Sequence, residues 1–387
     1  MTITAPAPPS TLPTRVVADG PVEAGPELRF RPRRFTFDGA LSVAGSMVSA
    51  LALMWIIYER MMPWSGVVGF WICWYVVFLV IFTNVVWLRE RNRLAVVDQF
   101  AAALVSGAAV LVLVALGLVI SYTIARGALA LRPNFFLETM RITGPLDPLT
   151  SGGALHAMVG TLEQVGLGVL FSVPLGIATG LYLNEVKGRL ARLVRTVVDA
   201  MSALPSIVAG LFIFASVILT FGQQKTGFAA SLALTVMMMP IITRTAEVVF
   251  RLVPGGLREA SYALGAPQWR TVLLVVLPTA RSSLVTAVIL GVARGVGETA
   301  PVLLTAGFTG AMNANPFEGQ QVSLPLYIFN YVRYPQPEMI ARAYGAALVL
   351  LLIVMILFVA ARLVGGNGPG QLGRRQRRKA RSVGGAT

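Results

Sequence analysis

Long apolar segments separated by short polar stretches occupy most of the chain. Eight of these segments approach the roughly 20 residues that an α-helix needs to cross the hydrocarbon layer of a membrane. They lie near residues 40–58, 67–88, 100–125, 157–183, 195–221, 228–250, 280–306 and 340–362. The composition agrees, because 56% of the residues are hydrophobic and 13% are charged. Since lipid offers no partners to free backbone groups, the sequence predicts an all-α polytopic membrane protein.

The segments that connect these spans alternate between the two sides of the membrane. Basic residues are concentrated in the segments of one side. Cytoplasmic connections of membrane proteins carry an excess of Lys and Arg, which predicts that both ends of the chain and the segment 254–278 face the cytoplasm. The expected inside residues include Arg89, Arg91, Arg93, Lys187, Arg189, Arg192, Arg195, Arg251, Arg258, Arg270 and Arg281. The outside connections hold a scatter of basic residues, namely Arg60, Arg126, Arg132, Arg141, Lys225 and Arg333.

Both ends of the chain read as cytoplasmic tails. Residues 1–36 are rich in Pro, Ala, Thr and Arg without periodicity, which predicts a disordered tail. Residues 363–387 are strongly basic. A polybasic run directly after a final span is typical of an anchor to lipid headgroups, and no nucleic-acid-binding module accompanies it. We therefore expect contact with membrane lipids and no nucleic acid.

The segment 254–278 is a polar, amphipathic interruption of an otherwise apolar chain. Leu257, Tyr262 and Leu264 can share one side of a short helix. Gly265 is a natural end for that helix, and Pro267 can begin the next one. The pattern predicts a short helix across the cytoplasmic mouth of the membrane bundle, where it is available to a partner.

The same segment resembles the EAA loop of ABC-importer permeases. The shared pattern is Glu259-Ala260-Ser261, then Gly265, Val275 and Leu277-Pro278, with Ser261 where the family usually has Ala. In that family the helix of the loop docks on the ATP-hydrolysing subunit. The resemblance implies that the coupling residues are Arg258, Glu259, Ala260, Ser261, Leu264, Gly265 and Ala266. A chance surface helix is the alternative.

Two charged residues, Arg294 and Glu298, fall within the apolar segment 280–306. They are four residues apart and so share one helix face, where they can partly neutralise each other. A charge near the bilayer centre costs about 2.5–3.5 kcal/mol on insertion scales, which is why such residues are functional candidates. Either Arg294 offers its planar donors to an oxyanion in the substrate pathway, with Glu298 holding or releasing it, or the two form a structural ion pair. Nearby glycines, Gly291, Gly295 and Gly297, favour close packing or local unwinding.

Other polar residues and prolines in the spans carry weaker signals. We interpret Arg244 and Glu247 as a network at the end of a helix, close to the 254–278 loop. Pro205 and Pro240 predict bends in the fifth and sixth spans. The residues that either line the pathway or bond across helices are Glu163, Gln164 and Asp199.

The chain lacks the motifs of an enzyme acting alone. No Lys follows a Gly, so a P-loop for ATP is absent, and one cysteine with one histidine offers no metal-spaced ligand set. We therefore expect no catalytic residues, no cofactor and no metal, with Cys73 and His156 serving packing. The energy for any transport must come from a partner subunit or an ion gradient, or no energy source is used.

Four segments together narrow the resemblance: ALPSIVAGLF, MPIITRTAEVVFRLVP, LREASYALGAPQWRTV and ARGVGETAPVLLTAG. They resemble the permease of the phosphate-specific ABC importer, within it the PstA-type subunit, over roughly residues 100–362. The resemblance implies a type I ABC-importer permease core of six transmembrane helices at 100–362. The chain departs from that six-span plan, because two additional transmembrane helices and a basic loop precede the core at 37–99.

The resemblance also implies partners. They are a PstC-type permease subunit, a dimer of ATP-binding cassette subunits and an extracytoplasmic phosphate-binding protein, all in or at the bacterial inner membrane. The outer segment 308–338 would meet the binding protein or plug the pathway. Three alternatives stay open: an ABC permease for another oxyanion such as sulfate or molybdate, a secondary transporter, and a membrane-bound interaction or sensor protein.

Overall fold

The computed structural model describes residues 37–61, 66–186 and 188–365, with helices and no strand among them. The predicted tail 1–36 and nearly all of the predicted tail 363–387 therefore lie outside the described residues, as does Lys187. The backbone contacts divide the chain into two compact units, residues 1–114 and residues 115–387. The division falls inside one long helix, α3 (Arg93–Gly127), so the predicted boundary at 99–100 stays a prediction.

The first unit holds the two additional N-terminal spans as a helical hairpin. Helix α1 (Phe37–Trp55) continues as the π-helical turn η1 (Ile56–Met61), and α2 (Val67–Glu90) follows. The hairpin closes around Ala50, Phe78 and Phe82, which are buried together. The hydroxyl of Tyr75 donates to the carbonyl of Ala103 at 3.1 Å and so joins α2 to the first part of α3.

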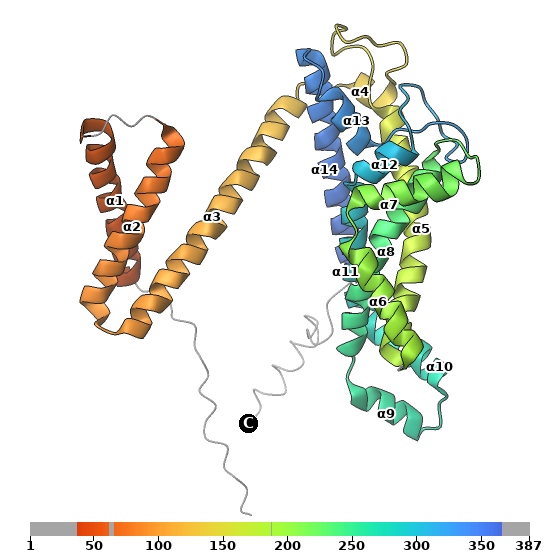
Figure 1. Ribbon diagram of the computed structural model, residues 1–387, viewed down its shortest axis with the longest axis horizontal. Helices are drawn as coiled ribbons and strands as arrows, with labels where there is room; N and C mark the ends of the chain where they lie inside the picture. Colours follow the sequence, from red (N-terminus) through yellow and green to blue (C-terminus); the bar gives the residue numbers. More distant parts are fainter. Residues whose placement is uncertain (1–36, 62–65, 187, 366–387) are drawn as a thin grey trace, which may run out of the picture. The chain divides into compact units, whose positions relative to one another are not determined.

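The second unit begins within α3 and contains all the residues of the predicted site. Figure 1 shows α9 at one end of this unit and α12 and α13 towards the other. The elements after α3 are α4 (Pro133–Leu137), α5 (Leu155–Glu185), α6 (Arg189–Ala203), α7 (Ser206–Ile213), η2 (Phe214–Leu219), α8 (Gly227–Arg251), α9 (Gly255–Ala263), α10 (Gln268–Thr271), η3 (Val272–Val276), α11 (Leu277–Val296), α12 (Ala300–Thr305), α13 (Leu324–Tyr331) and α14 (Pro337–Gly365).

Seven helices among the described residues are long and apolar enough to cross a membrane, and one bent pair raises the number to eight. The bent pair is the fifth predicted span, where α6 and α7–η2 meet at 109°. The bend predicted at Pro205 is thus confirmed, but it is sharp enough to break the helix. Leu204 is extended there (φ −66°, ψ 131°), because a proline disfavours helical geometry in the residue before it. The helix α8, in contrast, passes through Pro240 without a break.

The seventh predicted span, 280–306, was wrong in its bounds. The apolar helix runs over Gln268–Val296, and Gly297 to Thr299 separate it from α12. The helix starts earlier than predicted because η3 and α11 continue the helix that begins after Pro267. Pro278 lies directly after the π-helical turn η3 and does not end the helix.

Glycines allow close helix contacts through the middle of the second unit. A Cβ on Gly180 of α5 would lie 2.9 Å from the Cβ of Ala246 and 2.9 Å from the carbonyl oxygen of Thr243, both on α8. On α11, a Cβ on Gly291 would lie 2.5 Å from Cγ1 of Ile242. The close packing predicted for the glycines near Arg294 is therefore confirmed: α8 lies between α5 and α11 and touches both.

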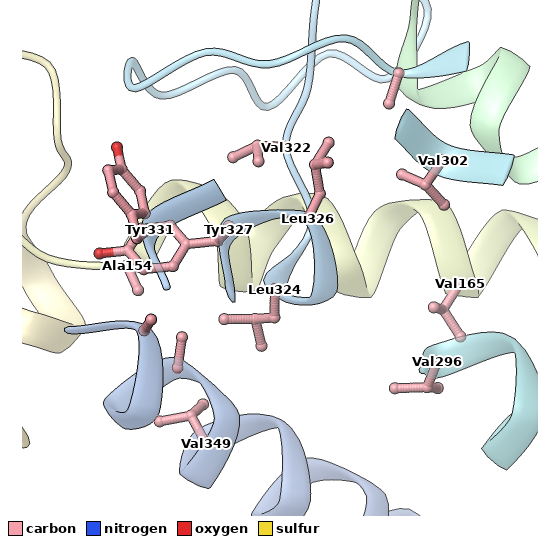
Figure 2. Close-up of a cluster of buried hydrophobic side chains, with 14 of the residues drawn as sticks. Ala154, Val165, Val296, Val302, Val322, Leu324, Leu326, Tyr327, Tyr331 and Val349 are labelled. Carbon is pink, nitrogen blue, oxygen red and sulfur yellow. The ribbon is translucent and has the colours of Figure 1, made fainter. Parts of the chain in front are cut away.

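The segment between α12 and α14 folds back into the core. Leu324, Leu326 and Tyr327 are fully buried, and Figure 2 shows Leu324 pointing from α13 towards α14, where Val349 lies. The backbone N–H of Leu324 donates to Oγ1 of Thr161 on α5 at 2.7 Å. This segment is thus an integral layer at one end of the unit.

Candidate translocation and coupling sites

Arg294 and Glu298 stand where the long helix α11 ends. Arg294 belongs to the last turn of α11, and Glu298 lies in the break before α12. Nε of Arg294 is 3.5 Å from Oε1 of Glu298, so the predicted pair forms. The negative end of the helix dipole also favours a cation at this position. Unlike the expectation of a pair inside a continuous helix, the charges sit at a helix terminus.

The two members of the pair differ in exposure. The side chain of Arg294 is 57% exposed within this chain, whereas that of Glu298 is 15% exposed. Their contact uses Nε, one of several guanidinium donors. The side chain of Arg294 is therefore largely uncovered by this chain and is accessible to an anion or a neighbouring subunit.

A deeply buried carboxylate organises the opposite end of the unit. Glu247 on α8 has a side chain only 3% exposed and pairs with Arg195 at 2.7 Å, Arg244 at 2.9 Å and Arg251 at 2.5 Å. Arg244 also contacts Asp199 of α6. The helix-end network predicted for Arg244 and Glu247 is confirmed. The spacing of four residues signals the Arg251 contact, but no local pattern signals Arg195.

The helix α9 forms the predicted loop helix, and all of its residues remain accessible. It ends as expected at Gly265, which adopts φ +77° and donates its N–H to the carbonyl of Tyr262 at 2.9 Å. Pro267 precedes α10 as its N-cap. Leu264 is almost wholly exposed, and Leu257 and Tyr262 are also exposed. Leu257, Tyr262 and Leu264 therefore give α9 and the turn after it an exposed apolar surface.

The other predicted coupling residues divide between the exposed face and the contacts that hold the loop. Glu259 and Ala260 are exposed, and Ala266 is half-buried. Oγ of Ser261 lies 2.8 Å from Oγ1 of Thr271, which ties α9 to α10. Arg258 turns inward and pairs with Glu185 at 3.2 Å. No local sequence pattern indicates the Glu185 contact, because Glu185 lies on a different helix, α5.

Glu163 and Gln164 bond to the returning outer segment. Nε2 of Gln321 donates to Oε2 of Glu163 at 2.5 Å, and Nε2 of Gln164 donates to the backbone carbonyl of Gln321 at 3.2 Å. Of the two roles predicted for these residues, the structure shows bonding between elements.

Burial raises the pKa of Tyr331, on the same segment, to about 12, so its phenol stays neutral.

An apolar groove lies in this unit, and neither Arg294 nor Glu298 is among the residues that line it. It encloses about 320 Å³ between α5, α11 and α14, with Val165, Val292 and Val354 in its lining.

His156 is buried with its ring 5.7 Å from that of Tyr327. Across the described ranges, no three His, Cys, Asp or Glu side chains are grouped to hold a metal ion.

The helical fold is similar to that of a chain in a solved ABC transporter. A chain in the crystal structure of a bacterial alginate ABC transporter, in complex with a periplasmic protein that binds an alginate pentasaccharide, superposes with a TM-score of 0.50 at 16% identity. The match covers 70% of this chain and 96% of that one. This likeness defines the fold alone.

The sequence comparisons place the chain within a family. It belongs to the family of binding-protein-dependent transport system inner membrane components, whose pattern matches residues 172–365. The phosphate transport system permease protein PstA 1 of Mycobacterium tuberculosis (strain CDC 1551 / Oshkosh) is 42% identical over 243 residues, which cover 62% of this chain and 79% of the relative. PstA of Mycobacterium leprae (strain TN) is 39% identical over 69% of this chain and 86% of its own length.

Proposed function

We propose that the chain is the permease subunit of an ABC importer that carries inorganic phosphate into the cytoplasm. The observation that carries this proposal is the 42% identity to a phosphate transport permease over four fifths of that relative's length. The exposed guanidinium of Arg294 at the end of α11 supports it, since a cation that its own chain leaves uncovered suits an anionic substrate.

Arg294 is the proposed substrate contact. Its terminal nitrogens can donate two parallel hydrogen bonds to a tetrahedral oxyanion, a geometry that guanidinium provides and ammonium does not. Glu298 is the proposed competitor for the same guanidinium. When the anion leaves, the carboxylate keeps Arg294 paired, and this lowers the cost of a charge within the membrane.

The segment 254–278 is the proposed coupling loop, with Arg258, Glu259, Ala260, Ser261, Leu264, Gly265 and Ala266 as its residues. Its exposed apolar surface fits a groove on an ATP-binding cassette subunit, two copies of which would hydrolyse the ATP. The charge bias of the connecting segments supports a cytoplasmic position in a bacterium for this loop and for both ends of the chain.

The proposal also includes two further partners and a division of the chain into a transport core and an accessory hairpin. A PstC-type permease subunit would cover the exposed side of α11 that carries Arg294, and an extracytoplasmic phosphate-binding protein would meet the opposite end, near α12 and α13. Residues 100–362 form the transport core, and residues 37–99 form an accessory hairpin in contact with lipid. The chain itself hydrolyses no ATP and binds no nucleic acid.

Uptake of radiolabelled phosphate in cells that lack the chain tests this proposal. Wild type should restore uptake, while Arg294→Ala should insert normally and abolish it, and Glu259→Lys should abolish it by disturbing the docking face. Sulfate uptake, measured in parallel, should be unchanged in every strain. Normal phosphate uptake without the chain, in cells with no redundant importer, would refute phosphate as the substrate and leave another oxyanion such as sulfate or molybdate.

A further inference from the structure

The attachment of α9 to the rest of the unit depends on very few side chains. None of its residues is buried, so apolar packing does little to fix its position. A helix of nine residues is too short to be rigidly placed by its own hydrogen bonds. A force applied to α9 by a docked subunit would therefore be lost unless a specific contact passes it to the membrane helices.

Arg258 provides such a contact. Its Nη2 donates to the backbone carbonyl of Phe250 at 3.0 Å and lies 3.2 Å from Oε1 of Glu185. One guanidinium thus joins α9 to the ends of two membrane helices, because Phe250 lies in the last turn of α8 and Glu185 is the last residue of α5. The Glu185 carboxylate also accepts a hydrogen bond from Nδ2 of Asn184 at 2.9 Å, which orients it.

Partial burial makes this pair stronger than an ordinary surface ion pair. The side chains of Arg258 and Glu185 are 22% and 12% exposed, respectively. Exposed pairs contribute little because water screens them and their side chains lose entropy on pairing. Shielded, charge-assisted hydrogen bonds that share one planar guanidinium are more rigid and more directional.

The two helices that Arg258 joins are packed too tightly to move independently. Gly180 of α5 fits against Ala246 of α8 with no room for a side chain. Further along α8, Met238 and Ile242 fill the spaces over Gly295 and Gly291 of α11. A continuous chain of contacts therefore runs from α9, through α5 and α8, to the turn of α11 that carries Arg294.

We propose that Arg258 is a positioning residue that transmits the displacement of α9 to the α5–α8 pair through its joint contact with Glu185 and the Phe250 carbonyl. This inference rests on the proposed function, since it assigns to one side chain the mechanical step between ATP hydrolysis and transport. The exposed residues of α9 bind the ATPase subunit, whereas Arg258 makes the bound helix move the membrane helices.

The test uses the complete importer, purified with its ATPase subunits and reconstituted in liposomes with the phosphate-binding protein. The measured quantities are recovery of the ATPase subunit, ATP hydrolysis, and radiolabelled phosphate transported per ATP hydrolysed. Arg258→Ala and Glu185→Ala should retain the ATPase subunit and hydrolyse ATP, but phosphate transported per ATP should fall about tenfold, as expected for loss of a charge-assisted contact. A purely structural role would lower recovery of the complex and leave this ratio unchanged.

Two further variants serve as a test of rescue and as a control. The exchanged pair Arg258→Glu with Glu185→Arg should recover part of the lost ratio, while Arg192→Ala, which removes an exposed arginine of α6 at the same end, should match wild type. A wild-type ratio in Arg258→Ala or Glu185→Ala would overturn the inference and leave the importer proposal standing. A wild-type complex that transports no phosphate would overturn both.

Discussion

Replacement of Gly160 by alanine should loosen the outer segment from α5. A Cβ at this position would lie 2.1 Å from the carbonyl oxygen of Val322, and this neighbour is backbone, which cannot rotate away. To reach the shortest contact that real Cβ atoms make, the segment must withdraw by about 0.9 Å. That movement pulls on the hydrogen bond between the Leu324 N–H and Thr161, which is 2.7 Å long and buried.

Two unfavourable terms and one favourable term set the expected change in the free energy of unfolding. Overpacking in a well-filled core costs about 1–3 kcal/mol. A buried N–H left without its acceptor costs about 1–3 kcal/mol more. The higher helix propensity of alanine returns up to about 1 kcal/mol. We therefore expect Gly160→Ala to lower the free energy of unfolding by about 1–5 kcal/mol.

Gly166 on the same helix is a matched control. Its Cβ would meet no atom within 4 Å, so Gly166→Ala should leave stability unchanged or raise it by about 0.5–1 kcal/mol. The assay is thermal unfolding of the purified chain in detergent, followed by circular dichroism. If Gly160→Ala unfolds at or above the wild-type temperature, the inferred close approach of Val322 to α5 is wrong.

Three other substitutions test the charged sites and the loop. Arg294→Lys should keep the charge but lose the planar donors, so phosphate uptake should fall about tenfold yet exceed that of Arg294→Ala; wild-type uptake would contradict the proposed contact. Glu247→Gln should lower thermal stability by about 1–3 kcal/mol, because it weakens three hydrogen bonds to arginine, and an unchanged unfolding temperature would show that the network contributes nothing. Gly265→Ala, at φ +77° with open space around it, should cost about 1–2 kcal/mol and speed proteolysis within 254–278, whereas equal cleavage rates would show that the turn tolerates a side chain.

The sequence alone predicts most of the membrane helices and the loop helix, because these depend on local properties. Apolar length determines whether a segment spans, and Gly265 and Pro267 mark where α9 ends and α10 begins. The pair of Arg294 and Glu298 also follows from a spacing of four residues. Each of these features needs only the residues within a few helical turns.

The fifth and seventh predicted spans differ from the structure because local sequence does not determine where their helices break. Apolar residues flank both Pro205 and the segment Gly297 to Thr299, so hydropathy alone assigns one span across each break, although Pro205 did predict a bend. The broken helices are stable because neighbouring elements fill the space. Gly210 of α7 fits against Pro301 of α12, where an added Cβ would lie 2.6 Å from Cα of Pro301.

Only the tertiary structure determines which groups far apart in the sequence form an ion pair or a hydrogen bond. Glu185 and Arg258 lie in different helices, α5 and α9, and Arg195 and Glu247 lie in α6 and α8, so both ion pairs depend on how the helices pack. Many carboxylates and arginines in the sequence have the right chemistry for such pairs. Packing selects among them, because an ion pair or a hydrogen bond acts over a few ångströms, and only the folded chain determines which groups come that close.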